Sequence, residues 1–451
     1  MNNHLCSDEL WLTEAPELLG DASVSQTIID ESKTMFEIMR KENAYAAHNY
    51  HPLPVVLDKG RGIYVWDTEG RVYMDFVAGV SAVNQGHAHP RILSAFIEQA
   101  SRLHLTSRGV YNSRFGPFAE RVTAVFGYDT ILPMNTGAEG VETAIKIARK
   151  WAYEKKKIPV GEARILSCRG NYHGRTIGTI AMSIDPLSRD GFGPFPEGLS
   201  CSLNYNSVED LENALEADGS KIAAFIVEPI QGEGGVVVPN DGYLTKCYEL
   251  CKKHNVLFIA DEIQTGMART GRLLCIDHEN LKADMVILSK SLSGGVYPVS
   301  AVLASNEVMS VICPGEHGST FGGNPLACAA VLAAIDVTLD ENLAENANVL
   351  GQIFREGVLS IGSPLVQEVR GKGLLNAVVI NESKFDNTTW DICLLLRKHG
   401  IIAKNTKGNV LRFAPPLCIK ESEILRAIDI IRTVLTEVTS VSKDEIPYAG
   451  L

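Results

Sequence analysis

The chain has 451 residues, of which 45% are hydrophobic and 21% are charged. This composition supplies enough apolar surface for a large buried core and excludes a chain that is disordered throughout. The net charge is −12, and no run of lysine and arginine exceeds three residues, so a nucleic-acid partner is not expected. No apolar run approaches the ~20 residues that cross a bilayer, so a membrane-spanning segment is not expected either.

The termini and the cysteines bear on the cellular compartment. Residues 1–30 contain acidic side chains but no arginine or lysine, which matches neither a secretory signal nor an arginine-rich presequence and favours the cytoplasm. The ten cysteines lack dense pairing, so reduced thiols are expected. Cys247 and Cys251 follow a helical apolar pattern that favours a core position, and His87 and His89 lack further ligands, so no metal site is predicted.

The first predicted elements are the strands 62–67 and 70–76, which read as a β-hairpin. Further along, residues 135–139 precede a predicted helix with one apolar face. That face consists of Val141, Ala144, Ile145, Ala148 and Ala152. The free amides at the start of this helix can bind a phosphate group, although an ordinary capped helix is the alternative.

Three short apolar runs in the middle of the chain predict a parallel sheet. They are Ile222–Val227, residues 256–259 and Met285–Leu288, and their starts lie 34 and 29 residues apart, which is about the length of a βαβ unit. Runs that are apolar on both faces indicate strands covered by helices on both sides. The sequence therefore predicts an α/β fold with a large domain over residues 86–344. We assign the two flanks of the chain, residues 1–85 and 345–451, to a smaller α+β domain. The second flank includes a predicted helix at 421–438.

Polar residues follow each of these runs, at the strand ends where doubly wound sheets bind ligands. They are Glu228, Asp261 and Lys290. A carboxylate and an amine at neighbouring strand ends suit pyridoxal 5'-phosphate, because Asp261 would keep the pyridine nitrogen protonated and Lys290 would form the Schiff base with the aldehyde. A buried ion pair is the structural alternative for these two residues.

A nicotinamide-binding site is tested by its Gly-x-Gly-x-x-Gly fingerprint. Gly232 and Gly234 are followed by Val237 where the third glycine is required, and the second glycine pair, at 371 and 373, is followed by Asn376. The fingerprint fails twice, which removes this class of cofactor.

The chain resembles the class III aminotransferases of pyridoxal-phosphate fold type I, over nearly all of residues 44–431. The resemblance is carried by residues 227–233, 258–272, 289–298 and 317–325. Other stretches resemble the ornithine aminotransferases within that family, namely 47–54, 81–87, 227–235 and 412–416. The resemblance implies a seven-stranded, mostly parallel sheet and a homodimer with shared active sites.

The resemblance also implies how the cofactor is held. Gly137 and Ala138 bind its phosphate through backbone amides, and Ser319 and Thr320 of the partner subunit reach the same phosphate. Tyr172 stacks on the pyridine ring of the cofactor, and Gln264 forms a hydrogen bond with the ring hydroxyl group.

For the substrate, the resemblance places Tyr50 at the α-amino group of ornithine and Arg175 at its α-carboxylate. Glu228 is a further candidate substrate-binding residue. Glu233 and Arg412 correspond to a pair that switches between the two half-reactions, with a plain salt bridge as the alternative. The expected reaction converts ornithine and 2-oxoglutarate into glutamate 5-semialdehyde and glutamate.

Two positions depart from the animal ornithine aminotransferases. Val80 stands where they have tyrosine, and His173 stands where they have tryptophan. A site without the hydroxyl group discriminates less against other amines, so N-acetylornithine and 4-aminobutyrate are alternative donors, and Val80 is a candidate substrate-binding residue. A protein that binds the cofactor, or a partner, without turnover is the alternative from another class.

Overall fold

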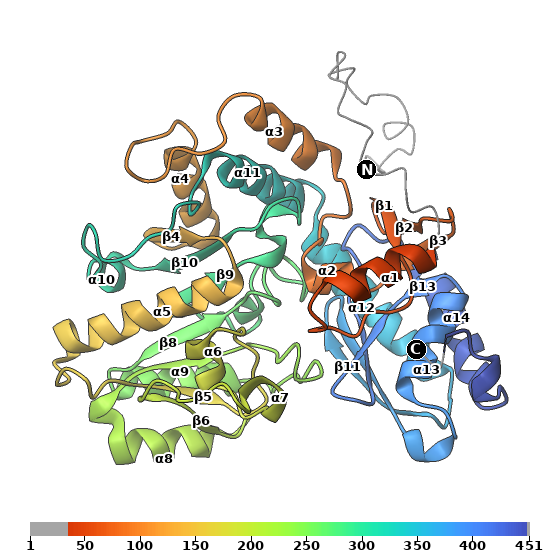
Figure 1. The fold of residues 1–451 in the computed structure, drawn as a ribbon. Coiled ribbons are helices and arrows are strands. Elements are labelled where there is room, and N and C mark those ends of the chain that lie inside the picture. The colour runs from red at the N-terminus through yellow and green to blue at the C-terminus, as the bar shows by residue number, and fades with distance from the viewer. Residues whose placement is uncertain (1–34, 449–451) are drawn as a thin grey trace, which may run out of the picture. The chain divides into compact units, whose positions relative to one another are not determined.

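The computed structural model describes residues 35–448, which form two compact units divided between Val56 and Leu57. The first unit holds helix α1 (Met35–Tyr45), and the second holds every strand of the described chain (Figure 1). Residues 1–30, on which the expectation of a cytoplasmic protein rests, lie outside the described residues. Within residues 35–448, no helix is long and apolar enough to cross a membrane.

A seven-stranded sheet forms the centre of the second unit, in the order β4-β10-β9-β8-β7-β5-β6. Its strands are β4 (Thr130–Met134), β5 (Arg164–Cys168), β6 (Leu199–Leu203), β7 (Ile222–Val227), β8 (Leu257–Asp261), β9 (Met285–Leu288) and β10 (Ser300–Ala304). The pairings from β9 to β6 are all parallel, whereas β10 is antiparallel to both of its neighbours. The predicted α/β class and mostly parallel sheet are confirmed.

The three predicted runs are strands of this sheet. β7 and β9 have the predicted bounds, and β8 begins one residue later than predicted and continues through Asp261. Every residue of the three strands is buried, because alternate side chains enter separate cores on the two faces of the sheet. Phe225 and Phe258 belong to the core on one face, and Ile226 and Ile259 belong to the core on the other.

Helices complete both cores. Figure 1 shows α5 (Gly137–Trp151) along one face of the sheet, where Val141, Ala144, Ile145 and Ala148 of the predicted apolar face are buried. Ala152, the last residue of that face, is buried just after the end of α5. The helices α9 (Tyr243–Lys253) and α11 (Pro325–Asp340) contribute to the opposite core. The other helices of this part are α2 (Ala78–Ser81), α3 (Pro90–Ala100), α4 (Phe115–Phe126), α6 (Ile177–Ala181), α7 (Pro186–Arg189), α8 (Val208–Asp218), α9 (Tyr243–Lys253), α10 (Asn306–Met309) and α11 (Pro325–Asp340). Shorter turns are η2 (Ala152–Lys156), η3 (Gly219–Lys221), η4 (Cys275–Glu279) and η5 (Lys290–Ser293).

Two four-stranded sheets are built from the flanks of the chain. The first has the order β1-β2-β3-β13, with β1 (Leu57–Arg61), β2 (Tyr64–Asp67), β3 (Val72–Asp75) and β13 (Ile401–Ile402). β2 and β3 form the predicted hairpin, and β3 pairs in parallel with β13 through Met74 and Ile401. Residues from both flanks therefore share one sheet, while the predicted boundaries at 85/86 and 344/345 stay a prediction.

The second of these sheets lies entirely in the C-terminal flank, in the order β11-β12-β15-β14. Its strands are β11 (Val366–Lys372), β12 (Leu375–Ile380), β14 (Lys404–Thr406) and β15 (Val410–Phe413). The remaining helices are α12 (Leu343–Ser360), η6 (Glu382–Lys384), α13 (Thr389–Lys398), α14 (Glu421–Glu437) and η7 (Lys443–Glu445). β15 carries Arg412, so this sheet contributes a predicted site residue.

The cysteine and histidine predictions have clear outcomes. Cys247 and Cys251 are fully buried on α9 as unpaired thiols, which confirms the core position. His89 precedes Pro90 at the start of α3, and Nε2 of His87 lies 2.7 Å from the carboxylate of Asp75. Nε2 of His89 lies 2.9 Å from the carboxylate of Glu341, so each of the two histidines pairs with a different carboxylate.

Candidate active site

The carboxyl ends of β7, β8 and β9 bring together the three polar residues that follow the predicted runs. Glu228 follows β7, Asp261 ends β8, and Lys290 begins the short helix after β9. Both carboxylates are at least 94% buried. Adjacent parallel strands end at the same edge of the sheet, which explains why these side chains share one site.

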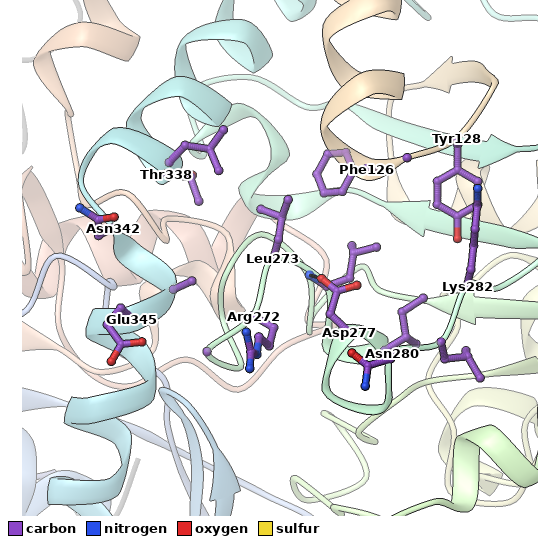
Figure 2. Close-up of a pocket in the computed structure, with 17 residues that line it drawn as sticks. Phe126, Tyr128, Arg272, Leu273, Asp277, Asn280, Lys282, Thr338, Asn342 and Glu345 are labelled. Carbon is purple, nitrogen blue, oxygen red and sulfur yellow. Dashed lines mark hydrogen bonds between the residues drawn. The ribbon is translucent and has the colours of Figure 1, made fainter.

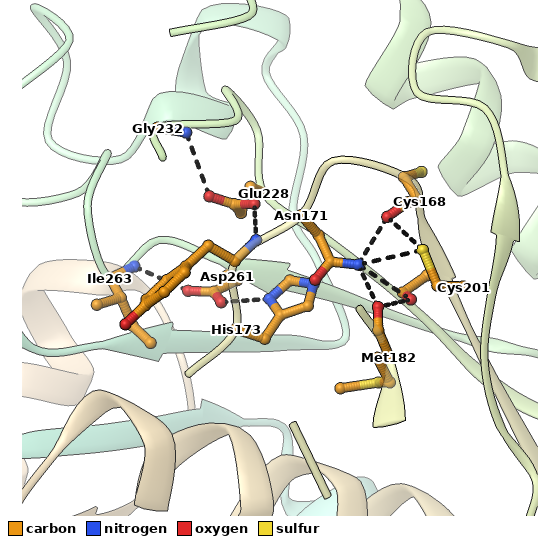
Figure 3. Close-up of polar contacts among 11 residues, drawn as sticks. Cys168, Asn171, His173, Met182, Cys201, Glu228, Gly232, Asp261 and Ile263 are labelled. Carbon is orange, nitrogen blue, oxygen red and sulfur yellow. Dashed lines mark hydrogen bonds and ion pairs between the residues drawn. The ribbon is translucent and has the colours of Figure 1, made fainter. Parts of the chain in front are cut away.

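A histidine from a fourth strand end holds Asp261. Nδ1 of His173 donates a hydrogen bond of 2.7 Å to Oδ2 of Asp261, while the amide of Ile263 donates to Oδ1 at 3.2 Å (Figure 3). Burial of the His173 ring acts to lower its pKa, but the hydrogen bond to Asp261 and the charge of Asp261 outweigh this effect and raise the pKa. The ring is fully buried, and its Nε2 has no hydrogen-bond partner within residues 35–448. This pairing keeps a carboxylate group oriented at the centre of the site.

The loop that carries His173 is fixed to the end of β5. Nδ2 of Asn171 donates to the carbonyl oxygens of Cys168 and Met182, at 2.6 and 2.5 Å (Figure 3). Gly174 has a φ of +125°, and a Cβ atom there would lie 2.9 Å from Cβ of Ala138. The loop therefore approaches the first turn of α5 as closely as a glycine allows.

Glu228 holds two neighbouring backbone segments. Its carboxylate accepts hydrogen bonds from the amide of Tyr172 at 2.9 Å and from the amide of Gly232 at 3.2 Å. Burial raises the pKa of Glu228 to about 7, and the charge of His173 opposes this rise. Glu228 thus acts on the loops around the site rather than facing an open surface.

Lys290 has an unusual backbone conformation, with a φ of +49°. The left-handed region is costly for a residue with a side chain, and such strain is concentrated at functional sites. Desolvation lowers the pKa of the Lys290 amine to about 8, while the nearby charges of Glu233 and Arg412 act in opposite directions. An amine with this pKa can lose its proton near neutral pH, which a base or nucleophile requires.

A chain of polar contacts links Gln264 to β15. Nε2 of Gln264 donates to Oε1 of Glu233 at 3.1 Å, and the same oxygen accepts a hydrogen bond from Nη1 of Arg412. Burial of the Glu233 carboxyl group acts to raise its pKa, but the charges of Arg412 and Lys290 outweigh this effect and lower the pKa. A Cβ atom at Gly232 would lie 1.9 Å from Oε1 of Gln264, so a larger residue there would displace this amide. The predicted Glu233–Arg412 ion pair is therefore present, with Arg412 only 7% exposed.

A cavity of about 430 Å³ opens beside this pair. Its lining includes Tyr172, His173, Arg175, Glu233 and Thr406. Arg175 is exposed, and its guanidinium carbon lies 5.0 Å from the centre of the Tyr172 ring. An exposed guanidinium at the edge of a cavity can form a bidentate pair with a carboxylate ligand.

The start of α5 presents backbone amides next to the site. Thr136 and Glu139 form a reciprocal capping box, and the amides of Gly137 and Ala138 precede the first intrahelical bonds. Ser319 comes from the loop before α11, and its Oγ accepts a hydrogen bond of 2.7 Å from Nδ2 of Asn135. The helix N-terminus can therefore bind an anion, with a hydroxyl group close to it.

The remaining predicted residues are Val80, Thr320 and Tyr50. Val80 belongs to α2, where residues 78–81 all have positive φ, and its own φ is +60°. Thr320 is exposed beside Ser319. Tyr50 lies in the first compact unit, after α1, so its part in the site stays a prediction.

Sequence reasoning missed the role of His173. The sequence marks it as a departure from the animal enzymes, but the hydrogen bond to Asp261 emerges only from the fold. The sequence did contain a signal for such a contact. Asp261 ends a fully apolar strand, so its carboxylate is expected to be buried and to need a hydrogen-bond donor.

A wider cavity, of about 820 Å³, lies apart from this chemistry (Figure 2). Arg272, Asp277, Lys282 and Glu345 are among the residues that line it, and none of the predicted site residues does. Size alone is thus a poor guide to the active site of this chain.

The residues of the site match the functional groups of pyridoxal phosphate. Lys290 offers an amine to the aldehyde, Asp261 offers a carboxylate to the ring nitrogen, and the start of α5 offers amides to the phosphate. Oε1 of Gln264 is a buried acceptor with no partner in the described part of the chain, as a ring hydroxyl would require. The fold and the site define a pyridoxal-phosphate-dependent transferase of fold type I.

Comparison with known proteins identifies the family. Residues 45–435 match the model of the aminotransferase class-III family, and the chain belongs to that family. It is 55% identical to the ornithine aminotransferase car2 of Schizosaccharomyces pombe, over 94% of this chain and 98% of that protein.

Solved structures agree with this assignment. A structure of the ornithine aminotransferase from Toxoplasma gondii matches this chain with a TM-score of 0.88 and 47% identity, and the match covers 90% of this chain and 95% of that one. That structure has partial occupancy of pyridoxal phosphate at its active site. The acetylornithine aminotransferase from Elizabethkingia anophelis has a TM-score of 0.82 and 50% identity, covering 90% of this chain and 100% of that one. As an aminotransferase, this chain takes amino acid and 2-oxo acid substrates.

Proposed function

We propose that this chain transfers the δ-amino group of L-ornithine to 2-oxoglutarate, which gives glutamate 5-semialdehyde and glutamate. The observation that carries the proposal is the Glu233–Arg412 ion pair at a cavity that is also lined by Arg175. Two arginines, one of them masked by a carboxylate, suit two substrates with different numbers of carboxylates. The names of the similar proteins support the same reaction.

The proposed cofactor contacts are supported by the geometry of the site and by the membership of the aminotransferase class-III family. The amides of Gly137 and Ala138 hold the phosphate, together with Ser319 and Thr320 of the partner subunit, and Asp261 holds the ring nitrogen. Tyr172 stacks on the ring, and Gln264 bonds its hydroxyl group. When bound, pyridoxal phosphate supplies an electron sink that accepts the amino group.

Substrate selection then depends on the arginines. Arg175 pairs with the α-carboxylate of ornithine and Tyr50 contacts its α-amino group, while Glu233 keeps Arg412 neutralised. With 2-oxoglutarate, Glu233 releases Arg412, which binds the α-carboxylate while Arg175 binds the distal one. Nζ of Lys290 is the base that removes a proton from the substrate carbon bearing the amino group and later returns one.

The proposal includes a homodimer, because Ser319 and Thr320 act in the partner's site. We also propose, from the composition of the chain, that the protein is cytoplasmic and has no nucleic-acid or membrane partner.

The test uses the purified protein. Borohydride reduction followed by mass spectrometry should place the cofactor mass on Lys290, and ornithine with 2-oxoglutarate should give glutamate and a semialdehyde that cyclises to pyrroline carboxylate. A chain that takes up no cofactor, or that holds it without product formation, would contradict the proposal.

A second candidate is a broader ω-aminotransferase, favoured by Val80 and by the likeness to an acetylornithine aminotransferase. Valine supplies no hydroxyl group to the substrate amine, so selectivity for ornithine is weaker. A panel of ornithine, N-acetylornithine and 4-aminobutyrate separates the candidates. If ornithine alone is used and Val80→Tyr leaves the selectivity unchanged, the broader reading is wrong.

A further inference from the structure

The loop 313–320 lies between α10 and α11 and carries Ser319. Two lysines of α5 hold one part of this loop. Nζ of Lys146 donates to the carbonyl oxygen of Glu316 at 3.1 Å, and Lys150 forms an ion pair with the Glu316 carboxylate. The same carboxylate accepts a hydrogen bond of 2.7 Å from the amide of Cys313. The loop is thus fastened to the exposed side of the helix whose N-terminus faces the site.

His317 makes the central contact of this attachment. Its Nδ1 lies 2.8 Å from Nζ of Lys146, and its Nε2 lies 2.8 Å from Oγ1 of Thr143. An ammonium group only donates, so Nδ1 has to accept and carries no proton. The hydroxyl of Thr143 donates to the carbonyl oxygen of Glu139 at 2.7 Å, which leaves it to accept from Nε2. The geometry therefore selects one neutral tautomer of His317.

Protonation of His317 would break this arrangement. A proton on Nδ1 would face the ammonium group of Lys146 and turn a hydrogen bond into a repulsion between like charges. The other charged groups near the ring are Glu139 of α5 and the Lys150–Glu316 pair. Burial and the charge of Lys146 lower the pKa of His317, and Glu139 opposes this, so the neutral ring prevails at neutral pH.

Ser319 gives the attachment a link to the cofactor. Its Oγ accepts hydrogen bonds from Nδ2 of Asn135 at 2.7 Å and from the amides of Phe321 and Gly322 at 3.3 Å. Within residues 35–448 the hydroxyl of Ser319 donates no hydrogen bond, so its proton is available to an anion. Asn135 lies two residues before α5, so the serine stands beside the N-terminus of that helix in its own chain, and the proposed dimer carries its hydroxyl to the partner's site.

We propose that neutral His317 is a positioning residue that fastens the loop 313–320 to Thr143 and Lys146 of α5 and thereby sets Ser319 for the cofactor phosphate in the partner's site. The inference rests on the proposed function for the phosphate site, but the attachment itself does not. Acidification releases the loop, and the affinity for the cofactor falls with it.

The experiment measures hydrogen exchange of the loop 313–320 in the holoenzyme at about pH 7.5 and pH 5.5, corrected for the intrinsic effect of pH on exchange. The wild-type loop should exchange about tenfold faster at the lower pH, after this correction. In His317→Gln, the amide can accept from Lys146 and donate to Thr143 without titrating, so the loop should stay protected at both values. In His317→Ala it should be unprotected at both, with a dissociation constant for pyridoxal phosphate about tenfold higher than that of the glutamine variant.

A second variant covers the case in which His317→Ala fails to fold. Lys146→Met removes the facing positive charge, so the midpoint of the pH-dependent release should move upward, towards the usual histidine value of about 6.5. His399→Gln, at a surface histidine paired with Glu437, is the matched control and should change nothing in the loop.

The outcomes separate the two proposals. Wild-type exchange that is independent of pH, or identical exchange in the alanine and glutamine variants, overturns the role of His317. A loop that shows the expected exchange in a chain that binds no pyridoxal phosphate leaves the attachment intact and contradicts the proposed function instead.

Discussion

The His173–Asp261 pair permits a quantitative prediction. In His173→Phe the ring volume is kept, but Asp261, which is 3% exposed, loses its donor at 2.7 Å. Removing one partner of a buried charged pair costs about 3–5 kcal/mol, whereas a variant that keeps a donor costs about 1 kcal/mol. His173→Asn is that matched variant, because its side-chain amide can donate from nearly the position of Nδ1.

Two assays follow from this difference. The phenylalanine variant should bind pyridoxal phosphate about 30-fold to 1,000-fold more weakly than the asparagine variant, as measured by absorbance titration of cofactor-free protein. Its melting temperature should also be lower, by about 5 °C. If both variants bind and melt alike, the hydrogen bond to Asp261 contributes nothing and the reasoning is wrong.

The same pair predicts a pH dependence. Because Asp261 raises the pKa of His173, the stabilisation by this pair is complete below about pH 6.5 and declines as the pH rises through the raised value. The difference in melting temperature between wild type and His173→Phe should therefore be larger at about pH 6 than at about pH 9. A difference that grows with pH would contradict the sign of the shift.

Three further predictions concern the same site. Lys290→Ala should abolish turnover and the borohydride-dependent mass increase, and persistence of that mass increase would move the attachment to another lysine. Glu233→Gln should lower kcat/KM for ornithine by about 10-fold to 100-fold and spare the half-reaction with 2-oxoglutarate, because the substitution exposes the charge of Arg412. Stopped-flow absorbance separates the two half-reactions. Equal losses in both would refute the masking of Arg412 by Glu233. Gly232→Ala should destabilise the fold by about 1 kcal/mol, measured as a lower melting temperature, because its Cβ would displace the Gln264 amide from its hydrogen bond to Glu233.

Much of the fold could be predicted because its strands are buried on both faces. Such strands appear in the sequence as apolar runs, and the residue after each run marks the ligand-binding edge, so Glu228, Asp261 and Lys290 were all predictable. The start of α5 was also predictable, because Thr136 and Glu139 have the spacing of a capping box.

Other features depend on contacts that no local pattern reports. β10 is as apolar as its neighbours, so its antiparallel direction is invisible in the sequence. Arg269 is fully buried and donates to the carbonyl oxygens of Leu374 and Pro415 and to the side chain of Asn84. Its partners lie more than one hundred residues away along the chain, so composition alone would place an arginine at the surface.

The left-handed turn at residues 78–81 illustrates the same limit. Only Gly79 among these four residues favours positive φ, and Val80 is β-branched and disfavours it. The hydrogen bonds from the amides of Val77 and Ala78 to Asp75 help to set this turn, and Asp75 is held in turn by His87. Tertiary structure therefore overrides local preference at the residue that we connect with substrate choice.

The parallel pairing of β3 with β13 has a consequence for biosynthesis. Met74 leaves the ribosome more than three hundred residues before its partner Ile401, which at ordinary rates of translation is a delay of roughly twenty seconds to one minute. During this interval the free edge of β3 is open to pairing with other chains. We therefore expect chaperone supply and growth temperature to control the yield of this protein more strongly than the stability of its finished fold does.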